Sequence, residues 1–184
     1  MTAQPTAALM TADQLIAMPR DGARQELVEG VLHEMPPPGF EHGQVSIRVA
    51  SLLSAFVRPR GLGVVTGETG FRLAADPDTV RAPDAAFVAA DRLPPRDQRR
   101  GYLRLAPDLA VEVLSPDDRP RAVAAKTRAW LAAGVRILWV IDPVARRATV
   151  HAPGQPAVEV GPGDTLDGGD ALPGFVLPVS DLFD

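Results

Sequence analysis

The chain has 184 residues, of which 46% are hydrophobic and 23% charged, and its formal net charge is −4 at pH 7. This length and balance predict one globular domain and exclude a disordered or fibrous chain. The lack of cysteine excludes disulfides, thiolate nucleophiles and sulfur-based zinc sites, and the acidic balance argues against a surface that is basic throughout.

No run of 18 apolar residues occurs, and the first twenty residues lack a basic start followed by an apolar stretch. We therefore expect no membrane span, no secretory signal and a cytoplasmic location. Residues 1–10 are predicted to form a loose N-terminus, and residues 11–184 a single domain.

Hydrophobic periodicity and turn residues define the expected elements in chain order. Thr11 and Gln14 have the spacing of a capping box, which begins a short helix that ends at Met18. Helices are also predicted over 41–57 and 118–133. Strands are predicted over 25–35 (a pair or one bent strand), 63–66, 70–73, 84–89, 108–114, 136–141, 147–151 and 157–160, with a loop over 91–107.

The predicted strand 108–114, helix 118–133 and strand 136–141 allow a right-handed crossover between parallel strands. The expected fold class is therefore α/β or α+β, with a mixed sheet flanked by helices. No basic residue follows Arg147, whereas six acidic residues do. Any phosphate should therefore be bound by the body of the chain and not by its tail.

Glu112 interrupts an otherwise apolar strand. Strand alternation places Glu112 with Ala110 and Leu114, opposite the face of Leu109, Val111 and Val113. A carboxylate in a central strand is costly unless a positive group meets it. Either this is an edge strand with Glu112 in water, or Glu112 is a metal ligand or a catalytic group.

Lys126 is the single lysine among 19 basic residues. On a helical wheel it falls on the same half as Val123 and Trp130, while Arg121 and Arg128 fall on the other half. The lysine is therefore expected to point toward the sheet that holds Glu112. An ammonium group there is stable only beside carboxylates or a phosphate.

Asp84 follows Pro83 at the start of an apolar strand, where a turn residue is the simpler explanation. Together with Glu112 and Lys126 it forms the set that Mg²⁺-assisted phosphodiester hydrolysis requires. Asp84 and Glu112 are the expected metal ligands, with Mn²⁺ as a substitute metal, and the Val113 carbonyl could join them. Lys126 would hold the attacking water and stabilise the transition state.

Several segments resemble the Uma-type family of putative restriction endonucleases, which belongs to the PD-(D/E)XK nuclease superfamily. The resemblance covers about residues 11–184, and it rests on the order and spacing of the motifs more than on any one of them. The segments are RQELVEGVLHEM, EHGQV, VRAPDAAFV, PDLAVEVLSPDDR, KTRAWLAAGVRILWVIDP and LPGFVLPVSDLF.

The resemblance implies a restriction-endonuclease-like core with extra N-terminal and C-terminal strands, a Mg²⁺-dependent site, DNA as substrate and a homodimer. Asp84 and Glu112 match the acidic motif residues, and Glu26 matches an acid that often completes such sites. The superfamily's lysine position is Leu114 here, and Lys126 matches members in which the lysine lies on the next helix. Where the family often has a tyrosine, this chain has Trp130, a change expected to affect packing more than chemistry.

His42 and Arg81 are the candidates for contact with nucleic acid. His42 lies in EHGQV and resembles a recurrent family histidine, although a helix-start residue with an ordinary hydrogen bond explains it equally well. Arginines of the 91–107 loop could contact backbone phosphates or simply be solvated.

Two hypotheses from different classes follow. The first is a Mg²⁺-dependent DNA endonuclease that uses Asp84, Glu112, Lys126 and Glu26. The second is a binding protein that keeps a nuclease fold without turnover, favoured by the acidic net charge and by Leu114. Hydrolysis of RNA or of another phosphate ester uses the same site chemistry.

Overall fold

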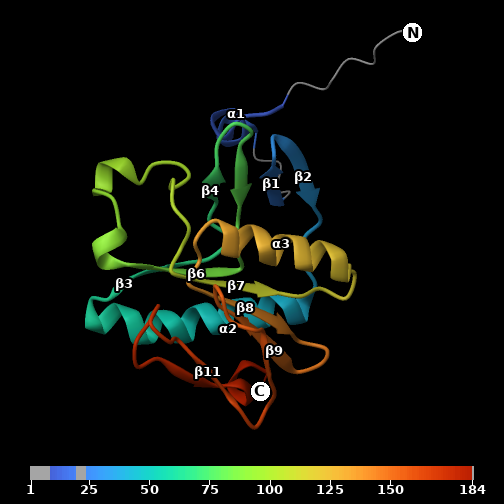
Figure 1. Cartoon of the computed structure of the whole chain (residues 1–184), viewed down its shortest axis with the longest axis vertical. Helices are drawn as coiled ribbons and strands as arrows, with labels where there is room; N and C mark the ends of the chain where they lie inside the picture. Colours follow the sequence, from blue (N-terminus) through green and yellow to red (C-terminus); the bar gives the residue numbers. More distant parts are fainter. Residues whose placement is uncertain (1–8, 20–23, 184) are drawn as a thin grey trace.

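A computed structural model describes residues 9–19 and 24–183 of the chain (Figure 1). Residues 1–8 of the predicted loose N-terminus lie outside the described residues. Met10 already contacts the domain, because its N–H donates to the carbonyl of Gly30 at 2.8 Å.

The main sheet has six strands in the order β10-β9-β8-β7-β6-β3. The neighbours β7 and β8 are parallel and joined by helix α3, as the sequence predicts, and the other pairs are antiparallel. The strands are β3 (Gly63–Thr66), β6 (Ala85–Ala89), β7 (Leu109–Val113), β8 (Ile137–Asp142), β9 (Arg147–His151) and β10 (Val158–Val160).

A second sheet of four strands has the order β2-β1-β5-β4 and packs beside the first. Helix α1 (Ala12–Ala17) lies against it and begins with the predicted capping box of Thr11 and Gln14. Of the two alternatives for residues 25–35, the strand pair is confirmed, as a hairpin that turns at Glu29 and Gly30, and the single bent strand is wrong. The strands are β1 (Arg24–Val28), β2 (Val31–Met35), β4 (Phe71–Ala74) and β5 (Thr79–Arg81).

Helices cover both faces of the six-stranded sheet (Figure 1). Helix α2 (Phe40–Val57) packs on one face together with the C-terminal segment, against the face of β7 that carries Leu109, Val111 and Val113. Helix α3 (Pro120–Ala132) lies on the other face, where Trp130 packs beside Ala110 and Leu138. The strand alternation predicted from the sequence is therefore confirmed for β7.

The remaining elements are short. Strand β5 and the antiparallel pair β11 (Thr165–Asp167) and β12 (Val176–Pro178) were not predicted, because three-residue strands among glycine, proline and aspartate show no clear period. The 91–107 loop contains two 3-10 turns. The 3-10 helices are η1 (Arg58–Arg60), η2 (Ala90–Arg92), η3 (Arg96–Gln98) and η4 (Val179–Leu182).

Within the described ranges, no helix is both long enough and apolar enough to cross a membrane.

The edge strand β3 depends on a glycine. Gly63 has φ +154°, and a Cβ there would collide with the carbonyl oxygen of Val88 on β6. We predict that Gly63→Ala lowers the free energy of unfolding by about 1–3 kcal/mol in urea titrations. Gly43→Ala is the control, because Gly43 lies in α2 facing open space. That change should stabilise the protein by about 0.5–1 kcal/mol, and equal effects of both substitutions would contradict the explanation.

Candidate active site

Four elements bring Glu26, Asp84, Glu112 and Lys126 together. Glu26 lies on β1, Asp84 immediately precedes β6, Glu112 lies on β7 and Lys126 on α3. The register of β6 and β7 pairs Ala85 with Val111, and continuing it by one residue sets Asp84 opposite Glu112. The side chains therefore converge from two sheets and a helix although they are distant in the sequence.

Lys126 contacts two of these carboxylates. Its Nζ lies 2.8 Å from Oε2 of Glu112 and 3.1 Å from Oε1 of Glu26. The lysine thus points toward the sheet, as its place on the helical wheel predicts. The alternative of an edge strand is wrong, because β7 lies between β6 and β8 and Glu112 is only 8% exposed.

Asp84 is held by three donors. Arg24 donates from Nη1 to Oδ1 at 2.7 Å, and the backbone N–H of Val113 donates to Oδ2 at 2.6 Å. Nε2 of His42 lies 3.4 Å from Oδ1. Burial opposes ionisation, but the contacts with His42, Arg24 and Val113 outweigh it and lower the pKa of Asp84.

Glu26 anchors the segment that leads to Asp84. Its Oε2 accepts from Arg81 at 2.7 Å, and its Oε1 accepts from the N–H of Ala82 at 3.1 Å. Arg24 also donates to the carbonyl of Ala82 at 2.6 Å. Burial opposes ionisation of Glu26, but Lys126 and Arg81 prevail and lower its pKa. Strand β1 therefore holds residues 82–84 through two side chains, because Glu26 binds the N–H of Ala82 and Arg24 binds its carbonyl and Asp84.

Glu112 behaves differently from the other two acids. Burial raises its pKa to about 7, although Lys126 favours the ionised form, and the nearby charges of Asp84 and Glu26 add to the rise. The indole N–H of Trp130 donates to its Oε1 at 2.7 Å. Trp130 therefore orients the carboxylate as well as filling the core, which corrects the expectation that it affects mainly packing.

The two residues predicted to contact nucleic acid lie inside this cluster. His42 is 6% exposed and faces Asp84, and Arg81 pairs with Glu26 at the end of β5. Their nearest charged neighbours are thus the carboxylates of the site. Of the loop arginines, Arg92 pairs with the buried Asp108 at 2.8 Å and serves the fold.

Arg24 was missed in the sequence, although it lies two residues before Glu26 and therefore on the same face of β1. That spacing was the available signal. Its importance comes from the pairing of β1 with β5, which sets its guanidinium group beside Asp84. Burial opposes the charge on Arg24, but Asp84 raises its pKa.

The donor chemistry at the centre of the cluster suits a hard divalent cation. Asp84 and Glu112 offer carboxylate oxygens, and Mg²⁺ takes one or two carboxylates from a protein while keeping several waters. Across residues 9–19 and 24–183, no group of three or more His, Cys, Asp or Glu side chains is arranged to hold a metal ion. In this structure the positive charges of Arg24 and Lys126 compensate Asp84 and Glu112. A cation would therefore have to compete with these two side chains for the carboxylate oxygens.

A crystal structure described as a putative nuclease belonging to DUF820, from Anabaena variabilis, superposes on the chain with a TM-score of 0.82 and 23% sequence identity. The match covers 95% of this chain and 97% of the other. This likeness establishes the fold.

The sequence profile of the Uma2 family, described as "Putative restriction endonuclease", matches residues 12–180. The chain belongs to this family, whose description supports a nuclease function. A comparison with curated proteins gives no match.

The raised pKa of Glu112 makes stability depend on pH. Between its ordinary value of 4.5 and about 7, the folded protein keeps a proton that the unfolded chain has released. This contribution favours folding fully below pH 4.5 and is lost as pH rises through 7. We predict that the stability of Glu112→Gln relative to wild type rises by up to about 3 kcal/mol between pH 4.5 and 8.

Urea unfolding of both proteins across this pH range measures the difference. Comparison with wild type at each pH removes the contributions of the other acids, which titrate in both proteins. A stability difference that does not change with pH would contradict the assignment of a raised pKa to Glu112.

Proposed function

We propose that the protein is a Mg²⁺-dependent endonuclease that hydrolyses DNA phosphodiester bonds at this cluster. The observation that carries the proposal is the contact of the only lysine with both Glu112 and Glu26, in a cluster that also holds Asp84. Family membership supports the reaction class. A homodimer, with one site for each DNA strand, is part of the same proposal.

Asp84 and Glu112 would hold the metal, which when bound supplies a Lewis acid and an activated water. Lys126 carries its positive charge at the same place, because Glu112 and Glu26 raise its pKa against the effect of burial. Its ammonium group would donate to the attacking water and to the negative charge that develops on the phosphate. Glu26 positions this ammonium group, and Arg81 and Ala82 position Glu26.

Arg24 and His42 both have nitrogen atoms beside Asp84, where a phosphate held through the metal would also lie. A guanidinium released from Asp84 could bind a phosphate oxygen with two parallel hydrogen bonds. We therefore assign Arg24 to phosphate binding, with His42 beside it. Arg81, which pairs with Glu26, acts here by positioning that acid.

Cleavage of DNA tests the proposal directly. Wild type should cleave plasmid DNA with Mg²⁺ or Mn²⁺ and lose activity in EDTA. Asp84→Asn and Lys126→Ala should each lower the rate by about 100-fold or more, because each removes transition-state stabilisation. Asp170→Asn makes the same charge change as Asp84→Asn on an exposed C-terminal residue, and should cleave like wild type. Equal rates in wild type, Asp84→Asn and Lys126→Ala would refute the proposal.

Metal binding separates the nuclease from a binding protein with a degenerate site. Titration calorimetry should show Mg²⁺ binding that disappears in Glu112→Gln. Because the cation competes with the proton on Glu112, the affinity should be about tenfold weaker at pH 6 than at pH 8. Absence of Glu112-dependent binding at either pH would favour the degenerate site.

A further inference from the structure

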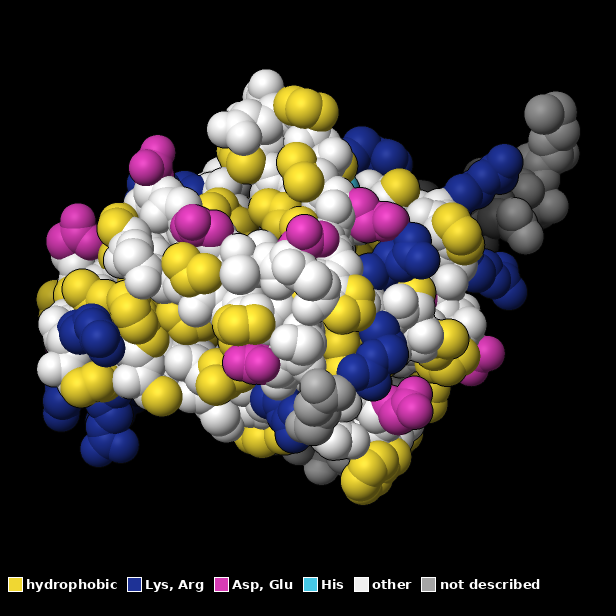
Figure 2. Space-filling model, turned by 90° about the horizontal axis from the view of Figure 1, so that it is seen from below, with side chains coloured by type: hydrophobic (Ala, Val, Ile, Leu, Met, Phe, Trp, Pro, Cys, Tyr) yellow, Lys and Arg dark blue, Asp and Glu magenta, His cyan; other side chains and the backbone are white. Residues whose placement is uncertain are grey.

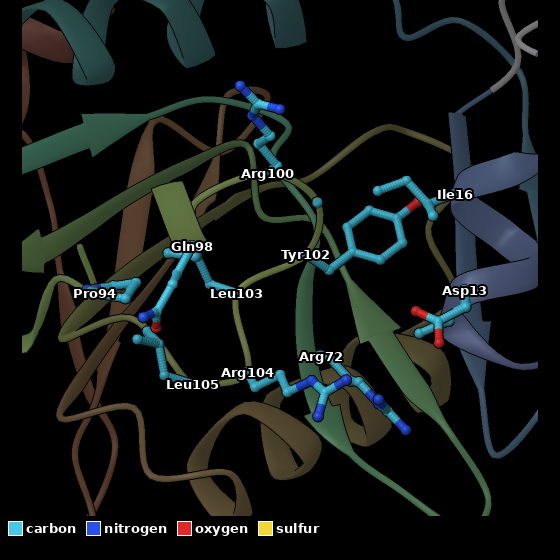
Figure 3. A pocket seen from close by; sticks show the side chains of 12 residues that line it. Asp13, Ile16, Arg72, Pro94, Gln98, Arg100, Tyr102, Leu103, Arg104 and Leu105 are labelled. Carbon is cyan, nitrogen blue, oxygen red and sulfur yellow. The ribbon is translucent and has the colours of Figure 1, made fainter. Parts of the chain in front are cut away.

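Two adjoining cavities lie beside the candidate active site. The first, of about 550 Å³, is lined by Arg24 and Ala82, which belong to the site, and extends to Tyr102. The second, of about 620 Å³, lies between α1, β4 and the 91–107 loop (Figure 3). Both are lined by Ile16, Gly101 and Tyr102, so they adjoin at these residues, and we call the two together the groove.

The groove carries two arginines that are not neutralised by an ion pair within the described residues. Its lining contains four arginines (Arg24, Arg72, Arg100 and Arg104) and two carboxylates (Asp13 and Glu68). Arg24 is paired with Asp84, and Arg72 with Asp78 at 2.6 Å. Arg100 and Arg104 are exposed and form no ion pair with any residue in the described part of the chain. These two guanidinium groups are therefore available to phosphates.

Tyr102 gives the middle of the groove an aromatic wall. Its ring packs against Gly70, where a Cβ would overlap the ring atoms, so the ring can lie there only because Gly70 has no side chain. The ring points from the loop toward Ile16 of α1 (Figure 3) and remains partly exposed. An aromatic face beside a basic track is the combination that binds successive bases and phosphates of a single strand.

The opposite side of the molecule differs from this groove. On the face seen from below in Figure 2, basic and acidic side chains are scattered among apolar ones. The acidic residues that follow Arg147, such as Glu159 and Asp164, belong to the C-terminal segments that pack with α2. Arg100 and Arg104, unpaired within the described residues, lie on the groove side, where they would attract phosphates.

We propose that this groove binds single-stranded DNA next to the scissile phosphate, with a base on Tyr102 and phosphates on Arg100 and Arg104. The preference for an unpaired strand follows from the aromatic wall, because the base faces of a duplex are already stacked on one another and cannot reach Tyr102. The inference rests on the proposed nuclease function and specifies its substrate as DNA with an unpaired segment.

Fluorescence anisotropy in EDTA tests binding without cleavage. A labelled single-stranded oligonucleotide should bind the full chain more tightly than a hairpin duplex of the same length. Arg100→Ala/Arg104→Ala should weaken single-strand binding about tenfold at low salt. It should also reduce the slope of log affinity against log salt by about 1.4, because two phosphate contacts are lost.

The matched control is Arg58→Ala/Arg121→Ala, which removes two exposed arginines outside the groove that also form no ion pair in the described part of the chain, and should leave the affinity within twofold of wild type. Tyr102→Leu should lower affinity about fivefold or more, whereas Tyr102→Phe should retain it, because stacking needs only the ring. Thermal unfolding of each variant establishes that it is folded.

Equal affinity for single strand and duplex, or equal losses in the groove and control variants, would overturn the inference. The experiments distinguish a failure of the nuclease proposal from a failure of the single-strand proposal. Binding with these properties but no metal-dependent cleavage refutes only the nuclease, and cleavage with no effect of the groove substitutions on binding refutes only the groove.

Discussion

Lys126 joins Glu26 on the four-stranded sheet to Glu112 on the six-stranded sheet through contacts of 3.1 and 2.8 Å. Arg24 and Arg81, both from the smaller sheet, hold Asp84 and the other oxygen of Glu26. Three buried carboxylates are tolerated together only because three cations compensate them. The arrangement of the two sheets and α3 depends on this compensation, since removing one partner leaves an unpaired charge in the interior.

The same compensation sets the chemical properties of the site. His42 and Arg24 lower the pKa of Asp84 and so keep it ionised. Burial raises the pKa of Glu112 to about 7, although Lys126 favours the ionised form. Two carboxylates that face each other across β6 and β7 can accept a hard cation, and a lysine already in contact with one of them can act on the same reacting group. In the proposed reaction, Lys126 and Arg24, which compensate the buried acids in the fold, would also interact with the phosphate.

Much of this cluster could be predicted from the sequence. Strand alternation set Glu112 on the face opposite Leu109, Val111 and Val113, and the helical wheel turned Lys126 toward the sheet that holds Glu112, because both periods are long enough to read. The contact of Arg24 with Asp84 and the hydrogen bond from Trp130 to Glu112 could not be predicted in this way. Arg24 reaches Asp84 only through the pairing of β1 with the three-residue β5. The hydrogen bond from the indole N–H depends on side-chain packing, which hydrophobic periodicity does not indicate. Strands β11 and β12 were missed because their segments are short and rich in glycine and proline.

We propose that Asp84 and Glu112 share one divalent cation. Anomalous diffraction from a crystal soaked in Mn²⁺ near pH 8, where Glu112 is ionised, tests it most directly. The account predicts one peak within coordination distance of both carboxylates, with Lys126 still beside Glu112. Density that leaves Asp84 on Arg24 and Glu112 on Lys126, with no manganese between them, would contradict it.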